Sequence, residues 1–499
     1  MATLTQTLGA RSRSAAAEAA GWLQENVFSS PYKLLFLAAL AGAALAAYRN
    51  QLEAAPTLAN LIGALWLMGL IGVAAGARTH RFNAVTQWLK DRLYNSPASV
   101  LITLLIGLLL TGLVRALLAW AVVNANFSAD PQIAAASEHI GATWGIIAAN
   151  LKLFMVGQFD REQVWRVWAS VGLLVLLGVV SFPVYGPFRD RLKPVRRIVT
   201  WAWLLSPPLL WLLLRGVGEG GFLGVVETRT WGGLLLTLII SVFAIVVSFP
   251  LGVLLALGRR STFQGVPGWL TYLTLGGVAA WGLVTTTFPN WPLVRAPLEY
   301  VLILWPVWLL AAGAAFQRVF KGNVVAAFCT VYIEFVRGVP LITVLFMANL
   351  MLPLFLPPDI SIENVFRAMW GFMFFSAAYL AENVRGGLQS IPRGQYEAAE
   401  ALGLNTLQQL WFIILPQALR VVIPPIVGQF IGLFKDTSLV AIVGLLDLLN
   451  IANAVVAQPD WLGLRREAYV FISVIYYVGC FGLAAAGRWM ERRLRVGQY

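Results

Sequence analysis

The chain has 499 residues, of which 59% are hydrophobic and only 12% charged, whereas a soluble protein carries about 25% charged residues. Its formal charge of +13 does not indicate nucleic-acid binding, because the basic residues cluster in short loops between apolar runs, as the positive-inside rule describes. Two cysteines inside apolar runs and two separate histidines exclude a disulfide framework and a metal site. Recurrent runs of about 20 apolar residues predict an all-α, polytopic membrane protein.

The chain up to residue 220 is predicted to form a tail and an accessory transmembrane module. Residues 1–32 are predicted to be a cytoplasmic tail with a surface helix at Ala15–Gln24. Within Asn124–Arg161, the stretch Ile140–Phe159 is moderately apolar and is assigned to the outer face as an interfacial or re-entrant segment. The basic loops Arg78–Arg92 and Arg189–Arg197 are predicted to be cytoplasmic. The first membrane spans are predicted at Leu34–Tyr48, Ala55–Ala77, Ala98–Val122, Val164–Tyr185 and Ile198–Leu214.

The glycine-rich segment Gly216–Gly224 is a natural linker, so a boundary is placed between an accessory module at 33–220 and a core at 221–499. Prolines interrupt two spans of the core, at Pro340 and at Pro424-Pro425. These breaks are either hinges of a gate or static kinks, and the sequence favours neither. Further spans bring the total to about twelve, at Trp231–Leu257, Trp269–Phe288, Leu298–Phe316, Val324–Leu352, Phe366–Leu380, Ala418–Val443 and Ala468–Ala486.

A polar interval at 390–416 is predicted to form a helix–turn–helix elbow outside the bilayer. Ser390-Ile391-Pro392 is a cap-and-proline helix start. Gly403 is suited to the left-handed conformation that ends a helix, and Asn405 with Gln408 to a capping box. Pro416 is predicted to close the second helix. The first helix presents a ridge of small residues, Ala398, Ala399 and Ala401, flanked by Glu397 and Glu400.

This interval resembles the EAA loop of permease subunits of ATP-binding cassette importers. The match is Glu-Ala-Ala, three residues, Gly, nine residues and Ile-x-Leu-Pro, which here are Glu397, Ala398, Ala399, Gly403, Ile413, Leu415 and Pro416. The flanks Val331–Leu341, Gly386–Gln395 and Leu415–Leu439 are similar to polar amino-acid importers. The resemblance implies a type I ABC importer fold with extra N-terminal transmembrane helices, and an elbow that couples to the ATPase.

The resemblance also implies partners. These are a cassette ATPase dimer that holds the ATP and Mg, a second permease subunit that is related but different, and a binding protein outside the membrane. A coupling elbow must be cytoplasmic, and the topology independently places it on the same face as the basic loops. Both termini are then cytoplasmic, and the chain is predicted to lie in the bacterial inner membrane.

No catalytic pattern accompanies these features. The sequence lacks a Walker A motif, a G-x-S-x-G nucleophile elbow and an H-E-x-x-H motif. The chain is therefore predicted to bind no cofactor and to catalyse no reaction, with ATP hydrolysed by a separate subunit.

Polar and ionisable residues inside the spans are candidates for a substrate path, because a charge at mid-bilayer requires a partner or a water-filled cavity. A zwitterionic amino acid needs a cation at its carboxylate and an acid at its ammonium. The alternative is structural, with Glu334–Arg337 and Glu382–Arg385 as ion pairs one helical turn apart and amides that hold helices together. The candidates are Glu334, Arg337, Asn349, Glu382, Arg385, Gln429, Lys435 and Asp436.

The sequence therefore predicts the membrane-spanning permease subunit of an ATP-driven amino-acid importer. The alternative is an ion-coupled secondary amino-acid transporter, which would carry ion-binding carboxylates at the midplane and no docking elbow. A membrane-embedded enzyme is a third class, and it would need a catalytic constellation.

Overall fold

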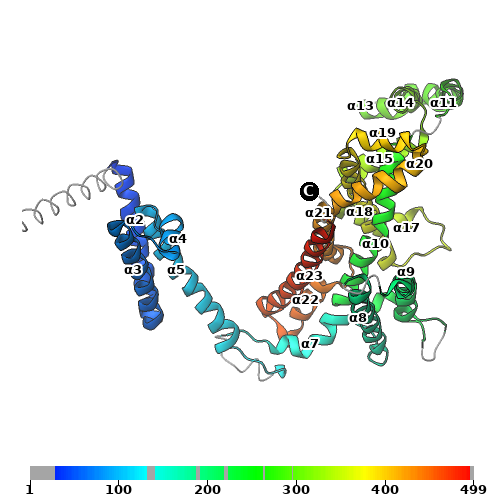
Figure 1. Cartoon of the computed structure of the whole chain (residues 1–499). Coiled ribbons are helices and arrows are strands. Elements are labelled where there is room, and N and C mark those ends of the chain that lie inside the picture. The colour runs from blue at the N-terminus through cyan, green and yellow to red at the C-terminus, as the bar shows by residue number, and fades with distance from the viewer. Residues whose placement is uncertain are drawn as a thin grey trace, which may run out of the picture. The chain divides into compact units, whose positions relative to one another are not determined.

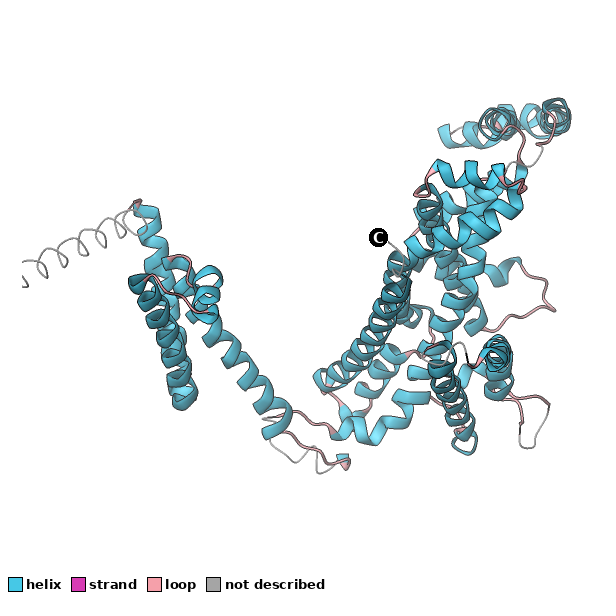
Figure 2. Cartoon of the chain, in the orientation of Figure 1, coloured by secondary structure: helices cyan, strands magenta, loops and turns pink. Residues whose placement is uncertain are grey.

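The computed structural model is helical throughout the residues it describes, with no β-strand among them (Figure 2). The expected surface helix at Ala15–Gln24 lies outside the described residues, as does most of the predicted tail. The described chain divides into two compact units, the first covering the residues up to 127 and 141–143, the second covering 128–131 and the residues from 144 onward. The described residues are 29–131, 141–186, 191–218, 223–261, 265–294 and 296–494.

The first unit is a small bundle of long apolar helices. Three of its helices begin with proline in the first turn, where the missing N–H costs no hydrogen bond. Arg115 donates from Nη1 to the main-chain oxygen of Ala54, at 2.6 Å, so its guanidinium satisfies a carbonyl at the end of the first helix. The helices are α2 (Pro31–Ala54), α3 (Pro56–Thr79), α4 (Ala84–Arg92) and α5 (Pro97–Leu118), which continues as a π-helical turn at Ala119–Val123.

The second unit is built around two helices that lie side by side, α10 (Gly233–Arg259) and α18 (Asn364–Gln389) (Figure 1). Small residues allow this close approach, since a Cβ at Gly252 would lie 2.7 Å from Leu380. In a membrane such close backbone packing replaces the hydrophobic effect as the main source of helix association. The other long helices are α8 (Trp165–Tyr185), α9 (Lys193–Arg215), α11 (Gly268–Gly282), α14 (Trp305–Phe320), α15 (Val324–Gly338), α21 (Leu415–Asp436) and α23 (Arg465–Leu494).

The segment that precedes α10 packs onto the core instead of forming part of the first unit. Trp211 of α9 meets Trp231 edge to face, with ring centroids 5.4 Å apart. The short helix α7 (Gly145–Val156) packs against α10 and α22 (Leu448–Val456), and Phe154 contacts Phe471 of α23. The division of the structure into compact units lies near residues 127–144, and the module boundary at 220 stays a prediction.

The predicted number of about twelve spans is not confirmed. Within the described residues, eight helices are long and apolar enough to cross a membrane, or up to ten if each of two bent pairs is one span. The two expected spans that fall short are Trp269–Phe288 and Phe366–Leu380. The first forms only a 15-residue α-helix before a π-helical turn. The second lies in α18, a 26-residue helix that carries Arg367, Glu382 and Arg385.

The two proline breaks differ. At Pro340 the chain bends by 107° between Val324–Gly338 and Leu341–Phe355, as expected. At Pro424-Pro425 the expected break is absent, and α21 runs through both prolines. These prolines remove two N–H donors from the helix, but α21 packs against α18 and α23, and such packing lets membrane helices tolerate proline.

Candidate functional site

The elbow begins where α18 ends. Ser390 donates from Oγ to the main-chain oxygen of Gly387, at 2.8 Å, and so closes α18 instead of capping the next helix. Pro392 occupies the N-cap position of α19 (Arg393–Ala401), with φ −60° and ψ 144° and no side-chain cap. The predicted helix start is therefore correct in position, but Ser390 plays a different part from the one expected.

The turn at Gly403 has the conformation that the sequence predicts. Gly403 has φ +73°, in the left-handed region that side chains with a Cβ disfavour. Its N–H donates to the main-chain oxygen of Glu400, at 2.8 Å, and the N–H of Leu404 donates to that of Ala399, at 3.3 Å. These bonds satisfy carbonyls at the end of α19.

The second helix of the elbow starts with the predicted capping box. Asn405 accepts from the N–H of Gln408 at 2.9 Å, and Gln408 accepts from the N–H of Asn405 at 3.0 Å. A single turn at Thr406–Gln408 passes through a π-helical segment at Gln409–Ile414 directly into α21. Pro416 does not close this helix, because it lies in the first turn of α21, where proline needs no N–H.

The elbow has an exposed face and a buried face. Ala399 is only 2% exposed and points inward, so the predicted ridge consists of Ala398 and Ala401 alone. Leu415 is buried in the core cluster and Ile413 packs against it, while Pro416 is exposed. We define the elbow surface as the exposed residues Glu397, Ala398, Glu400, Ala401, Leu402, Gly403 and Leu407.

Two leucines give the elbow surface its apolar character. Leu402 is 76% exposed and Leu407 is 67% exposed, on either side of Gly403. An apolar ridge with two neighbouring carboxylates is a surface that suits a groove on another protein. The sequence motif did not single out these leucines, although their apolar side chains at a predicted turn were a signal.

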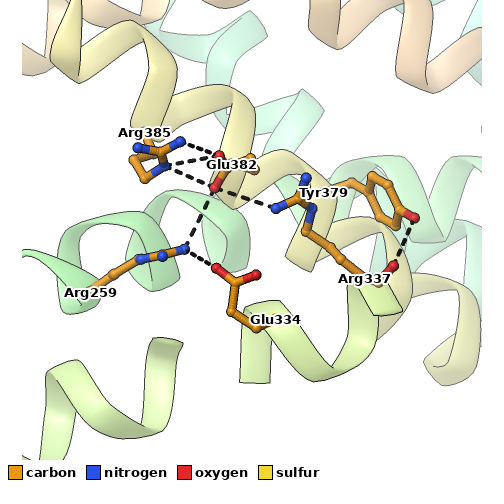
Figure 3. Close-up of polar contacts among 6 residues, drawn as sticks. All are labelled: Arg259, Glu334, Arg337, Tyr379, Glu382 and Arg385. Carbon is orange, nitrogen blue, oxygen red and sulfur yellow. Dashed lines mark hydrogen bonds and ion pairs between the residues drawn. The ribbon is translucent and has the colours of Figure 1, made fainter. Parts of the chain in front are cut away.

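Near the end of α18, an ion network joins three helices (Figure 3). Glu382 is its centre: Arg385 donates from Nε to both carboxylate oxygens, at 3.0 and 2.9 Å. Arg337 of α15 and Arg259 of α10 approach the same carboxylate at 3.7 and 3.6 Å. Arg259 also pairs with Glu334 of α15 at 2.9 Å. We call these five residues the three-helix network.

The network confirms one predicted pair and replaces the other. Glu382 and Arg385 pair within one helical turn, as expected. Among the described side chains, Glu334 and Arg337 do not pair with each other but reach Arg259 and Glu382 on other helices. Sequence analysis did not single out Arg259 as a member of this network.

None of the network's ion pairs involves the remaining candidates for a substrate path. Gln429 donates to the main-chain oxygen and Oγ of Ser376, at 2.8 and 3.0 Å, and accepts from Asn383 at 2.8 Å, so it holds α21 to α18. Asn349 is 4% exposed and donates to Leu345 at 3.1 Å. Lys435 is exposed at the end of α21, and its neighbour Asp436 is half-buried. The described contacts do not gather these residues into one site.

Comparisons with known proteins identify the family of this chain. Residues 308–496 match the family described as binding-protein-dependent transport system inner membrane component. The chain is 36% identical over 424 residues to the inner membrane amino-acid ABC transporter permease protein YhdY of Escherichia coli, across 84% of this chain and 96% of that protein. It is 33% identical over 465 residues to the glutamate/glutamine/aspartate/asparagine transport system permease protein BztC of Rhodobacter capsulatus, across 82% of this chain and 93% of that one.

A solved structure, described as a crystal structure of an amino acid ABC transporter with histidines, is similar at 22% identity and a TM-score of 0.37. That alignment covers 52% of this chain and 92% of the other, and a likeness at this score adds nothing to the assignment. The two long permeases are sufficient, because this chain matches nearly their whole length at more than 30% identity. The chain therefore belongs to the inner-membrane permease subunits of amino-acid ABC transporters.

Proposed function

We propose that this chain forms the translocation path of an amino-acid importer and receives its energy from a separate ATPase through the elbow surface. The observation that carries the proposal is the geometry of Glu397–Leu407. A short helix there ends in a glycine turn, and the two expose alanine, leucine and carboxylate side chains. A free-standing permease has no use for such an exposed apolar ridge outside its spans.

The proposed partners follow from the family. An ATPase dimer binds the elbow surface and holds the ATP and Mg, a second permease subunit of related but different sequence completes the path, and a binding protein delivers the solute. The proposed solutes are amino acids, in keeping with the names of both long relatives. No described contact favours the ion-coupled alternative, and neither long relative is named as an ion-coupled transporter.

We propose that the elbow and both termini face the cytoplasm. The basic loop Arg78–Arg92 and the elbow fall on one side when the predicted spans are threaded in order, and the positive-inside rule makes that side cytoplasmic. ATP is also on that side, which the coupling role of the elbow requires.

The experiment that tests the proposal is co-purification of the cassette ATPase with variants of the tagged chain. Leu402→Asp places a charge on the apolar ridge and is expected to abolish recovery of the ATPase, because an unpaired charge at an apolar contact is costly. The matched control is Leu462→Asp, at an equally exposed leucine (73%) between α22 and α23. Equal recovery of the ATPase with both variants would overturn the docking role of the elbow.

A further inference from the structure

We propose that Arg259 is a positioning residue that transmits movement of the elbow to α15 and to the bend at Pro340. This inference rests on the proposed function, since it concerns how energy from the elbow reaches the path. Arg259 lies at the end of α10, 2.9 Å from the carboxylate of Glu334 and 3.6 Å from that of Glu382. It is therefore shared between α15 and α18.

The first step is that α18 moves with the elbow. Only residues 390–392 separate α18 from α19. The hydroxyl of Tyr396 on α19 reaches back to the main-chain oxygen of Leu388, at 3.4 Å, and Tyr396 packs against the same core cluster as Leu388. A force applied to the elbow surface thus reaches the last turns of α18, where Glu382 and Arg385 lie.

The second step is that the contacts of Glu382 differ in strength. Arg385, on the same helix, holds the carboxylate through bonds of 2.9 and 3.0 Å and fixes its orientation. The contacts from Arg337 and Arg259 on other helices are longer, at 3.7 and 3.6 Å. When α18 shifts, these longer contacts change first, and Arg259 stays paired with Glu334.

The third step is that α15 receives the movement just before its bend. Glu334 and Arg337 lie on the last turns of α15, which ends at Gly338 and is followed by the 107° bend. The guanidinium of Arg337 also lies over the ring of Tyr379 of α18, 5.6 Å from its centre, as Figure 3 shows. A change in the three-helix network therefore acts next to the bend at Pro340, the larger of the two bends between paired helices.

A static clamp is the competing explanation for the same contacts. Removal of a clamp lowers the amount of assembled protein but leaves the number of solute molecules carried per ATP unchanged. Removal of a positioning residue lowers that ratio in protein that has assembled normally. The ratio of uptake to hydrolysis therefore separates the two explanations.

The experiment uses the complete reconstituted complex and measures labelled amino-acid uptake and ATP hydrolysis in the same vesicles. Arg259→Gln is expected to lower uptake per ATP about fivefold or more, the lower end of measured couplings between sites. The matched control, Arg260→Gln, changes the next residue, an exposed arginine, and is expected to leave the ratio unchanged. Both contacts come from the single atom Nη1. Arg259→Lys retains a cationic nitrogen on a shorter side chain, so an intermediate ratio is expected.

A second variant tests the same inference if Arg259→Gln fails to fold. Glu334 is 56% exposed and its replacement by glutamine removes the nearer partner of Arg259 without leaving a deeply buried charge. Glu334→Gln is expected to lower uptake per ATP as well. A wild-type ratio in either variant would overturn the inference, whereas a wild-type complex without any ATP-dependent uptake would overturn the proposed function instead.

Discussion

Substitution of Gly403 offers a direct test of the elbow, because within this chain only its backbone conformation opposes a side chain. The residue has φ +73°, and no atom of the described residues lies within 4 Å of the position that a Cβ would occupy. A larger side chain therefore meets no steric obstacle within the described part of this chain, and recovery of the ATPase reports any obstacle to docking. Its only cost is the left-handed conformation, about 1–2 kcal/mol for a residue with a Cβ and less for asparagine, whose side chain stabilises this conformation locally.

Three variants then form a graded series. Gly403→Asn is expected to retain most of the uptake, and Gly403→Ala to lower the equilibrium constant for the correct elbow conformation by about fivefold or more, since each 1.4 kcal/mol is a factor of ten. Gly403→Pro is expected to abolish uptake. Proline fixes φ near −65°, and it removes the N–H that donates to Glu400 at 2.8 Å.

The assay is ATP-dependent uptake in vesicles, normalised to the amount of permease in the membrane, with recovery of the ATPase measured in parallel. Membrane insertion is expected to be normal in all three variants, because Gly403 lies in the turn outside the long apolar helices. Normal uptake by Gly403→Pro, or a ranking in which Ala exceeds Asn, would refute the reasoning from backbone conformation.

Three further predictions concern other parts of the chain. Burial raises the pKa of Asp447, the N-cap of α22, to about 6, so this carboxylate destabilises the fold as pH rises from about 4 to about 6. Asp447→Asn keeps the cap and removes this loss of stability at higher pH, whereas Asp447→Ala loses the cap. The check is the melting temperature of the purified complex at pH 5 and pH 8, which is required to differ less in Asp447→Asn than in the wild type. In a chain without its native cysteines, single cysteines in Arg78–Arg92 are expected to resist an impermeant thiol reagent outside intact cells, and rapid labelling would contradict the topology. A shortened chain that starts at 221 is expected not to assemble, whereas one that starts at 141 keeps α7–α9 against the core and is expected to assemble; equal assembly would place the boundary at 220 after all.

The features that sequence could predict are those fixed by a few neighbouring residues. The capping box of Asn405 and Gln408, the left-handed Gly403 and the bend at Pro340 each depend on local backbone chemistry. The pairing of Glu382 with Arg385 is local as well, because residues three apart share a helix face.

The features that sequence could not predict depend on packing between distant segments. Arg259 joins the three-helix network only because α10, α15 and α18 meet at their ends. Ala399 turns inward because the elbow packs onto the core, although it belongs to the same small-residue run as Ala398. Pro416 does not end a helix, because it lies in the first turn of α21. Neither the residue type nor its spacing in the motif indicates that a helix starts there.

The central claim is that ATP hydrolysed by a separate subunit drives amino-acid uptake through this chain. The most direct measurement is uptake of labelled amino acids by vesicles that contain the purified complex, with the binding protein on one side and ATP supplied on the side of the elbow. The account predicts accumulation that requires ATP, binding protein and ATPase together, and that is lost when the elbow surface carries Leu402→Asp. Accumulation driven by a proton or sodium gradient in the absence of ATP would contradict it.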